Sequence, residues 1–388
     1  MKTLRPVNTF TKFKKREKRY FLAAIFTGLL LAIPHNTHAC SLVIRAGAEK
    51  KARVNIGGYC QINGKNNPVA LSTGPEVRRR AFVTNSDGDS LSIIDRDTYK
   101  VVKTIKVGDY PHHTIVSLDG RRLYIGNTHS DTVTAIDLIT ENIVETLPLL
   151  DPYNFYYTPD RSLLVTTCTR LGRIEIHGAE DLKEATEIKG KGRGWKRLAR
   201  IHTGRDPNHF AFSPDGHFMY VSNEHSHQLS VIDLWERRLL RQVNTGRRPV
   251  DVALAPGGKS LFVANYGEGY VTVYDTESFN ELKRIKTGAG AHGMATDIGG
   301  KTLFVSNRNN NSVSAIDISR QEVIRTFKVP QGPDMLEVTP DGRELWVTGR
   351  YGGNIYVVDL ATGKVTHRIR TGASPHGIVL IDLIIPPR

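Results

Sequence analysis

Histidine and aspartate recur at matching places along this chain of 388 residues. His292, Asp334 and His376 follow one another at intervals of 42 residues, in the segments "AHG", "PDM" and "PHG". His112 belongs to a similar segment, "PHH", much earlier in the sequence. Neutral imidazole nitrogens and carboxylate oxygens bind zinc, copper or iron, and such a metal can polarise a carbonyl group or lower the pKa of a bound water. These four residues are therefore a candidate site for a transition metal or haem.

Further polar side chains occupy neighbouring positions of the same segments. The first position after the proline, or its equivalent, holds His112, Tyr153, Asn208, Val250, His292, Asp334 and His376. The second position holds His113, Asn154, His209, Asp251, Gly293, Met335 and Gly377. Strand-like segments nearby are followed by His129, Cys168, His225, Tyr266, Arg308 and Arg350. Guanidinium groups bind carboxylates through paired hydrogen bonds, so the two arginines suit an anionic ligand. The candidate ligand-binding residues are His112, Asn208, His209, Arg308 and Arg350. A metal site, a small-molecule pocket without a metal and a solvated rim all remain open.

The repeat that carries these residues has the length of one propeller blade. From residue 81 onward, similar segments end at Asn85, Asn127, Thr167, Asn223, Asn265, Asn307 and Gly349, and four of the six intervals are 42 residues. Each is followed by segments such as "SLSIID", "VVKTIKVG" and a proline-led one. They are short, rich in Val, Ile, Tyr, Phe and Thr, and bounded by turn-forming residues, as strands are. Four strands per repeat and seven repeats predict an all-β, seven-bladed β-propeller over residues 81–388.

The segments "AFVTN" and "MYVSN" resemble the motif of the YVTN-type β-propeller family, and the resemblance covers residues 81–388. The third repeat departs most, because Thr167 replaces the asparagine and the next interval is 56 residues. The resemblance implies an exported or surface propeller whose proline-led strands line a central channel, with the polar residues at its mouth. It leaves the chemistry open, because propellers host binding modules, lyases, lactonases and redox enzymes alike.

The sequence ends on half a repeat. "SPHGIVLIDLII", at residues 374–385, is a proline-led strand with no strand after it, whereas residues 81–107 supply three strands with none before them. Joined, the two pieces make one blade, so we expect the C-terminal strand to close the ring beside the N-terminal strands. Closure would place His376 between Asp334 and His112.

Residues 1–39 have the features of a signal peptide. A basic stretch, "KFKKREKR", precedes 14 apolar residues, which is short of the ~20 needed to span a membrane. We expect export to the periplasm or cell surface, an N-terminal extension over residues 40–80, and no transmembrane span in the mature chain. The "AC" ending also fits a lipoprotein signal, in which Cys40 would carry a lipid anchor, and an uncleaved anchor is a third alternative.

The three cysteines are Cys40, Cys60 and Cys168. In an oxidising compartment Cys40 and Cys60 could form a disulfide, which lipidation of Cys40 would prevent. Cys168 follows the third repeat motif on the channel face, where a metal ligand and a plain buried thiol are both compatible with its position.

Charge and missing motifs narrow the function. The formal charge is +14, but half of it lies in residues 1–40, so we expect no nucleic-acid partner. The basic insertion at residues 189–200 is expected to be a solvated loop, with a docking patch as the alternative. No nucleophile elbow, phosphate loop or c-type haem motif is present, which leaves open whether the chain is an enzyme. The first hypothesis is a cell-envelope propeller that binds a small molecule or an envelope protein on its His-rich face. The second is a metal- or cofactor-dependent enzyme, lactonase-like, lyase-like or redox, with its site at the channel mouth.

Overall fold

The computed structural model describes residues 42–45, 51–56, 76–179, 187–188 and 192–385. The expected signal peptide, the lipid anchor and disulfide at Cys40, and Cys60 lie outside the described residues. Within the described part, the helical segments are four single 3₁₀ turns: η1 (Ser86–Gly88), η2 (Thr169–Leu171), η3 (Glu224–Ser226) and η4 (Arg308–Asn310). No described helix has the length and apolar character required to cross a membrane.

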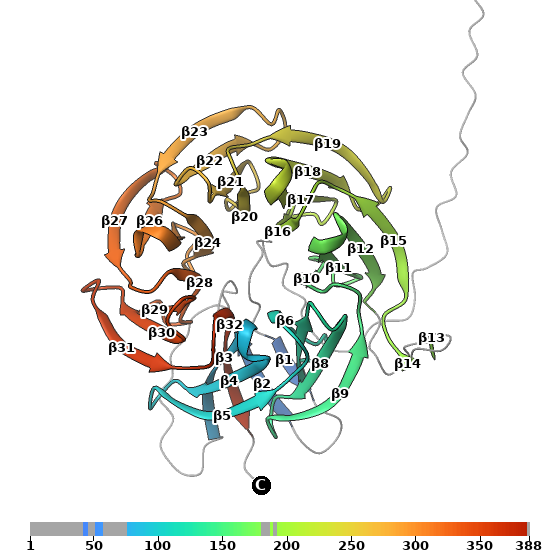
Figure 1. Cartoon of the computed structure of the whole chain (residues 1–388), viewed down its shortest axis with the longest axis vertical. Coiled ribbons are helices and arrows are strands. Elements are labelled where there is room, and N and C mark those ends of the chain that lie inside the picture. Colours follow the sequence, from blue (N-terminus) through green and yellow to red (C-terminus); the bar gives the residue numbers. More distant parts are fainter. Residues whose placement is uncertain (1–41, 46–50, 57–75, 180–186, 189–191, 386–388) are drawn as a thin grey trace, which may run out of the picture. The chain divides into compact units, whose positions relative to one another are not determined.

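Seven antiparallel sheets of the propeller succeed one another around a central channel (Figure 1). One blade contains β6 (Pro111–Val116), β7 (Arg122–Asn127), β8 (Thr132–Asp137) and β9 (Asn142–Pro148). The next contains β10 (Asn154–Tyr157), β11 (Leu163–Cys168), β12 (Arg173–Gly178) and β15 (Arg197–His202), with β13 (Glu187–Ile188) and β14 (Gly192–Arg193) as a separate pair. The third contains β16 (Pro207–Phe212), β17 (Phe218–Asn223), β18 (Gln228–Asp233) and β19 (Arg238–Asn244). The fourth contains β20 (Pro249–Leu254), β21 (Ser260–Asn265), β22 (Tyr270–Asp275) and β23 (Glu281–Lys286). The fifth contains β24 (Ala291–Thr296), β25 (Thr302–Asn307), β26 (Ser312–Asp317) and β27 (Glu322–Lys328). The sixth contains β28 (Pro333–Val338), β29 (Glu344–Gly349), β30 (Asn354–Asp359) and β31 (Val365–Arg370). The predicted seven-bladed propeller is confirmed, and the proline-led strands are the innermost ones.

The seventh blade joins the two ends of the repeat region. It contains β32 (Pro375–Ile385), β3 (Glu76–Asn85), β4 (Ser90–Asp95) and β5 (Lys100–Lys106). β32 pairs with β3 along nearly its full length, from Ile385 opposite Glu76 to Pro375 opposite Asn85. Two further strands, β1 (Leu42–Arg45) and β2 (Lys51–Ile56), extend this sheet, with β2 paired to the other edge of β32. The predicted closure by the C-terminal half-repeat is confirmed.

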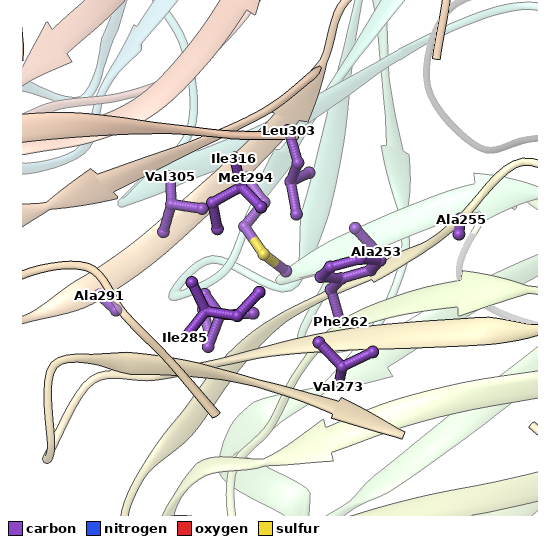
Figure 2. Packing of buried hydrophobic residues seen from close by; sticks show 12 residues of the cluster. Ala253, Ala255, Phe262, Val273, Ile285, Ala291, Met294, Leu303, Val305 and Ile316 are labelled. Carbon is purple, nitrogen blue, oxygen red and sulfur yellow. The ribbon is translucent and has the colours of Figure 1, made fainter. Parts of the chain in front are cut away.

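The hydrophobic core lies between neighbouring blades rather than within any one of them. Figure 2 shows one such layer, in which Phe262 and Ile285 of one blade pack against Met294, Leu303 and Ile316 of the next. The closing blade is packed in the same way on both sides. Ile381 lies in a cluster with Leu123 and Ile125 of the β6 blade, and Leu380 lies in another with Trp346 of the β28 blade.

The repeated asparagine and glycine have a structural explanation. Asn307, at the end of β25, donates hydrogen bonds to the hydroxyls of Ser312 and Ser314 on β26, at 3.1 and 3.0 Å. Asn85, Asn127, Asn223 and Asn265 bond hydroxyls of their own third strands in the same way. A Cβ atom on Gly288, the glycine of the preceding "TG", would lie 2.9 Å from Asn307 Cγ, so this close approach requires glycine.

The third repeat uses its basic insertion differently from the solvated loop that we expected. Arg197–His202 forms β15, the outer strand of this blade, so the last four residues of the insertion, 197–200, are part of the sheet. Trp195 is only 4% exposed and packs edge-on against Tyr124 of the neighbouring blade, with ring centroids 5.3 Å apart. Burial of Trp195 removes it from any docking surface. Residues 189–191 lie outside the described residues.

Candidate functional site

The beginnings of the inner strands present two successive residues to the channel. In β6 the pairing with β7 holds at Pro111 and resumes only at Thr114, and β16, β24 and β28 show the same break. Such an irregularity interrupts the alternation of side chains between the two faces of a strand. His112 consequently lines an outer cavity at the channel mouth, and His113 lines an inner one.

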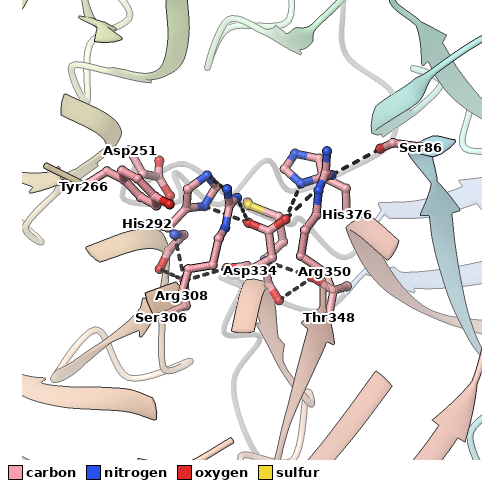
Figure 3. A network of polar contacts seen from close by, with 12 residues as sticks. Ser86, Asp251, Tyr266, His292, Ser306, Arg308, Asp334, Thr348, Arg350 and His376 are labelled. Carbon is pink, nitrogen blue, oxygen red and sulfur yellow. Dashed lines mark hydrogen bonds and ion pairs between the residues drawn. The ribbon is translucent and has the colours of Figure 1, made fainter. Parts of the chain in front are cut away.

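Asp334 is the centre of the polar network at the mouth (Figure 3). Its side chain is fully buried, and Oδ1 accepts a hydrogen bond from Arg308 and lies 2.9 Å from His292 Nδ1. Oδ2 lies 2.8 Å from His376 Nδ1 and 3.7 Å from Arg350 Nη1. Four side chains from three neighbouring blades therefore converge on one carboxylate.

These contacts fix the protonation of the network. Burial opposes the charge of Asp334, but the Arg308 guanidinium together with His292 and His376 outweighs it, and the pKa of this carboxyl is well below its usual value. Burial lowers the pKa of His376 to about 3, although Asp334 acts in the opposite direction. Because a carboxylate only accepts hydrogen bonds, the neutral His376 ring must carry its proton on Nδ1, which leaves a lone pair on Nε2. His292 is also held neutral, since burial and then Arg308 lower its pKa.

The hydroxyl of the repeated "VTN" or "VSN" segment anchors the backbone beneath these side chains. Ser306 Oγ donates to the carbonyl oxygen of Asp334, and Thr84 Oγ1 donates to that of His112, each at 2.6 Å. In both cases the carbonyl belongs to the next blade around the ring. Ser222 makes the same bond to the carbonyl oxygen of Val250, so in these three places the repeat positions the first channel residue of the following blade, whatever its side chain.

The outer cavity has a volume of about 320 Å³, which is at the small end of the range for ligand pockets. It is lined by Tyr110, His112, Tyr153, Thr169, Asp206, Asn208, Glu224, His225, Arg248, Val250, Tyr266, His292, Arg308, Arg350 and His376. Three arginines and three tyrosines are among them. Arg350 donates to the hydroxyl of Tyr110 at 2.9 Å, and the guanidiniums of Arg248 and Arg308 lie 4.6 and 5.5 Å from the Tyr266 ring centroid.

The charges in this cavity are distributed unevenly, because its acidic lining residues Asp206 and Glu224 both belong to the β16 blade, where Asp206 contacts His225. Arg248 is paired with Glu224, which also accepts a hydrogen bond from Asn208 at 3.0 Å. Arg308 and Arg350, by contrast, share the single carboxylate of Asp334. The wall formed by these two arginines therefore carries one positive charge more than its buried partner neutralises.

The inner cavity lies behind the first and is smaller, about 60 Å³. Its lining includes His113, His209, Asp251 and Glu337. His376 Nε2 lies 3.3 Å from His113 Nε2, and a nitrogen of His112 completes a group of three within 4.8 Å of one another. His209 repeats the pairing seen at Asp334, with Nδ1 3.2 Å from Asp251 Oδ1.

The structure brings together the residues that we selected from the sequence, but it divides them between two cavities. His112, Asn208, Arg308 and Arg350 line the outer cavity, whereas His209 lines the inner one. Of the four candidate metal ligands, His112 and His376 lie in the three-histidine group. His292 and Asp334 lie beside it and are engaged with Arg308.

The site also contains residues that we did not select from the sequence. Tyr110, Asp206 and Arg248 each directly precede the proline of an inner strand and have φ of 54°. The position before the proline was therefore a usable signal. Glu224 directly follows Asn223, the position that Arg308 holds after Asn307. Cys168 is fully buried, its thiol bonds to the carbonyl oxygen of Leu150 at 3.3 Å, and burial raises its pKa well above the usual value.

Comparison with solved structures finds the same fold in proteins of diverse description. Hydrazine synthase of Kuenenia stuttgartiensis is 20% identical, with a TM-score of 0.60 over 78% of this chain and 99% of that one. A protein of unknown function from Desulfotomaculum acetoxidans is 16% identical, with a TM-score of 0.64 over 78% and 98%. Apo AztD from Citrobacter koseri is 14% identical, with a TM-score of 0.57 over 79% and 98%. Identities this low establish the fold alone.

No curated protein sequence matches this chain. The family profile of YncE-like β-propellers matches residues 67–386, which include the four strands of every blade and exclude the additional strands β1 and β2. The predicted membership in a YVTN-type propeller family is thereby confirmed. The chain belongs to the YncE-like β-propeller family.

Proposed function

We propose that this chain is an exported binding protein that holds a small anionic molecule in its outer cavity. The observation that carries the proposal is the wall formed by Arg308 and Arg350, whose two guanidiniums share one buried carboxylate. Arginine binds carboxylate or phosphate oxygens through pairs of hydrogen bonds, so an anion at this wall would balance the remaining charge. Export is supported by the basic and apolar pattern of residues 1–39.

The remaining lining suits a small polar ligand. A volume of about 320 Å³ limits its size, and the aromatic rings of Tyr110, Tyr153 and Tyr266 can cover its apolar part. Asn208 and Glu224 lie in the β16 blade. The Asn208 amide can donate or accept a hydrogen bond, and the Glu224 carboxylate can accept one from a hydroxyl or amino group of the ligand. The ligand class is therefore a small carboxylate or phosphate ester that also carries polar groups.

The test is a binding screen by calorimetry with small carboxylates and phosphate esters, each beside its neutral amide or alcohol. We expect the charged members to bind and the neutral ones to fail. Replacing Arg350 by Gln should weaken binding about 10–100-fold, because a hydrogen bond to a charged group contributes roughly 1.5–3 kcal/mol. Arg284→Gln is the matched control, since Arg284 lies on the outer strand β23 and pairs with Glu281. Equal binding of acids and amides, or equal loss in both variants, would refute the proposal.

A metal- or cofactor-dependent enzyme is the second candidate. This hypothesis rests on the three-histidine group rather than on the arginine wall. The outcome of the anion-binding screen does not depend on whether the hypothesis is correct.

A further inference from the structure

The three histidines at the floor of the outer cavity bring ring nitrogens close enough together to share one metal ion. His376 Nε2 and His113 Nε2 face each other at 3.3 Å, and because His376 carries its proton on Nδ1, its Nε2 offers a lone pair. Two imidazole nitrogens bound to one tetrahedral metal at 2.0–2.1 Å would be separated by about 3.3–3.4 Å. The observed distance matches that separation.

The third histidine supplies a buried nitrogen without a protein partner. His112 is 3% exposed, and its Nδ1 has no hydrogen-bond partner. Its ring lies against that of His376, with centroids 3.8 Å apart. A buried polar atom without a partner costs roughly 1–3 kcal/mol, which coordination of a cation would remove. One nitrogen of each of the three histidines lies within 4.8 Å of the others.

Asp334 completes the arrangement from behind. Histidines that bind metals usually donate their other ring N–H to a carboxylate, which fixes the ring and makes the coordinating nitrogen more basic. His376 does this with Asp334 at 2.8 Å. The carboxylate also offsets one of the two positive charges of Arg308 and Arg350, which reduces their repulsion of a cation at the floor of the cavity.

We propose that His112, His113 and His376 bind one divalent transition-metal ion, of the zinc or copper class, between the outer and inner cavities. Three neutral imidazoles suit these ions. The set of three ligands is complete only when β32 closes the propeller, because His376 lies on β32 and the other two histidines lie on β6. Asp334 acts as a positioning residue and His292 takes no part in coordination. The site goes beyond the proposed anion binding and does not depend on it.

A fourth imidazole stands beside the three. The ring of His209 lies edge-on to that of His113, with centroids 4.7 Å apart, and its Nε2 is buried without a partner. Its Nδ1 lies 3.2 Å from Asp251, as His376 lies from Asp334. His209 is therefore placed to strengthen the site from the inner cavity, whereas the outer side stays open to an incoming ligand.

The test measures Zn²⁺ and Cu²⁺ binding to the tag-free chain, stripped with a chelator, by calorimetry and by metal content after dialysis. We expect one ion per chain. His113→Gln should weaken binding by at least about 100-fold, since loss of even an outer-shell partner costs 10–100-fold. His367→Ala is the control, because His367 lies on the outer strand β31 and stacks on Tyr99. Thermal unfolding of each variant checks that the propeller is intact, and His113→Gln remains informative if His376→Gln fails to fold.

Two further variants separate this donor set from its neighbours. His292→Ala should retain the ion, whereas loss in His292→Ala together with retention in His113→Gln would overturn the assignment. Asp334→Asn should keep one ion per chain, bind it about 10–100-fold more weakly and alter the visible spectrum of bound Co²⁺. A mere folding defect would lower the occupied fraction without altering that spectrum. Absence of stoichiometric binding by the unaltered chain would refute the site, while intact anion binding to the same preparation would leave the proposed function standing.

Discussion

Each blade contains one position at which the same residue type recurs in most blades and another at which the residue type changes from blade to blade. At the ends of the second strands, Asn85, Asn127, Asn223, Asn265 and Asn307 recur and make equivalent bonds to third-strand hydroxyls. At the first channel position, by contrast, the blades present different side chains, among them His112, Asn208, His292 and Asp334. The first set of residues supports five of the seven blades in the same way, and the second gathers unlike side chains at the mouth of the ring. Function in this molecule is therefore expected where the repeat is broken.

The largest expected effect comes from opening the ring, on which both sets depend. Deleting residues 374–388 removes β32, including the buried side chains Leu380, Ile381 and Leu383. Burial of three such side chains contributes roughly 5–9 kcal/mol, which is comparable to the whole stability of a domain. We expect loss of cooperative thermal unfolding, measured by calorimetry. Deletion of residues 386–388 alone is the control and should leave the transition in place; an unchanged transition in the longer deletion would contradict the closure.

The next effect distinguishes a unique aspartate from a repeated one. Asp334→Asn leaves Arg308 and Arg350 without their common counter-charge, and breaking a buried pair costs roughly 3–5 kcal/mol. Asp317, whose carboxylate accepts the Arg320 N–H in an exposed turn, should tolerate the same change with little loss of stability. Chemical denaturation of both variants measures the difference. Equal losses would mean that the channel-mouth carboxylate has no special structural role.

A repeated position should give an intermediate loss that is similar from blade to blade. Asn307→Ala removes the bonds to Ser312 and Ser314 and should cost roughly 1–3 kcal/mol. Asn265→Ala, which removes the bond to Thr272, should behave alike. Denaturation midpoints compare the two, and a strongly unequal pair would show that the repeated asparagines are not interchangeable supports.

The last effect concerns Glu337 and grows as pH rises above about 4.5. Burial beside the inner cavity raises the pKa of this carboxyl from 4.5 to about 8. Because the folded state retains the proton that the unfolded state loses, stability should fall as pH rises from about 4.5 to 8. Glu337→Gln should therefore unfold at a higher temperature than the unaltered chain at pH 9 and at nearly the same temperature at pH 5. A difference of equal size at both pH values would point to lost packing instead.

Much of the fold follows from the sequence because strand periodicity and the 42-residue repeat are local signals. The half-repeat at the C-terminus even predicts the closing blade. The site is only partly predictable, since contacts such as that between His113 and His376 join residues 263 positions apart. The irregular start of each inner strand turns two successive side chains toward the channel, which simple alternation does not predict. The engagement of Asp334 by Arg308 likewise depends on side-chain packing across blades.

The central claim is that unlike channel-mouth residues bind the ligand while the repeated residues only support the ring. It is tested most directly by measuring the affinity of the best-binding anion for three forms: the unaltered chain, Arg350→Gln and Asn307→Ala. We predict a loss of about 10–100-fold in Arg350→Gln and no loss in folded Asn307→Ala, even though Asn307→Ala lowers the free energy of unfolding by roughly 1–3 kcal/mol. Equal weakening in both variants, or none in Arg350→Gln, would contradict the account.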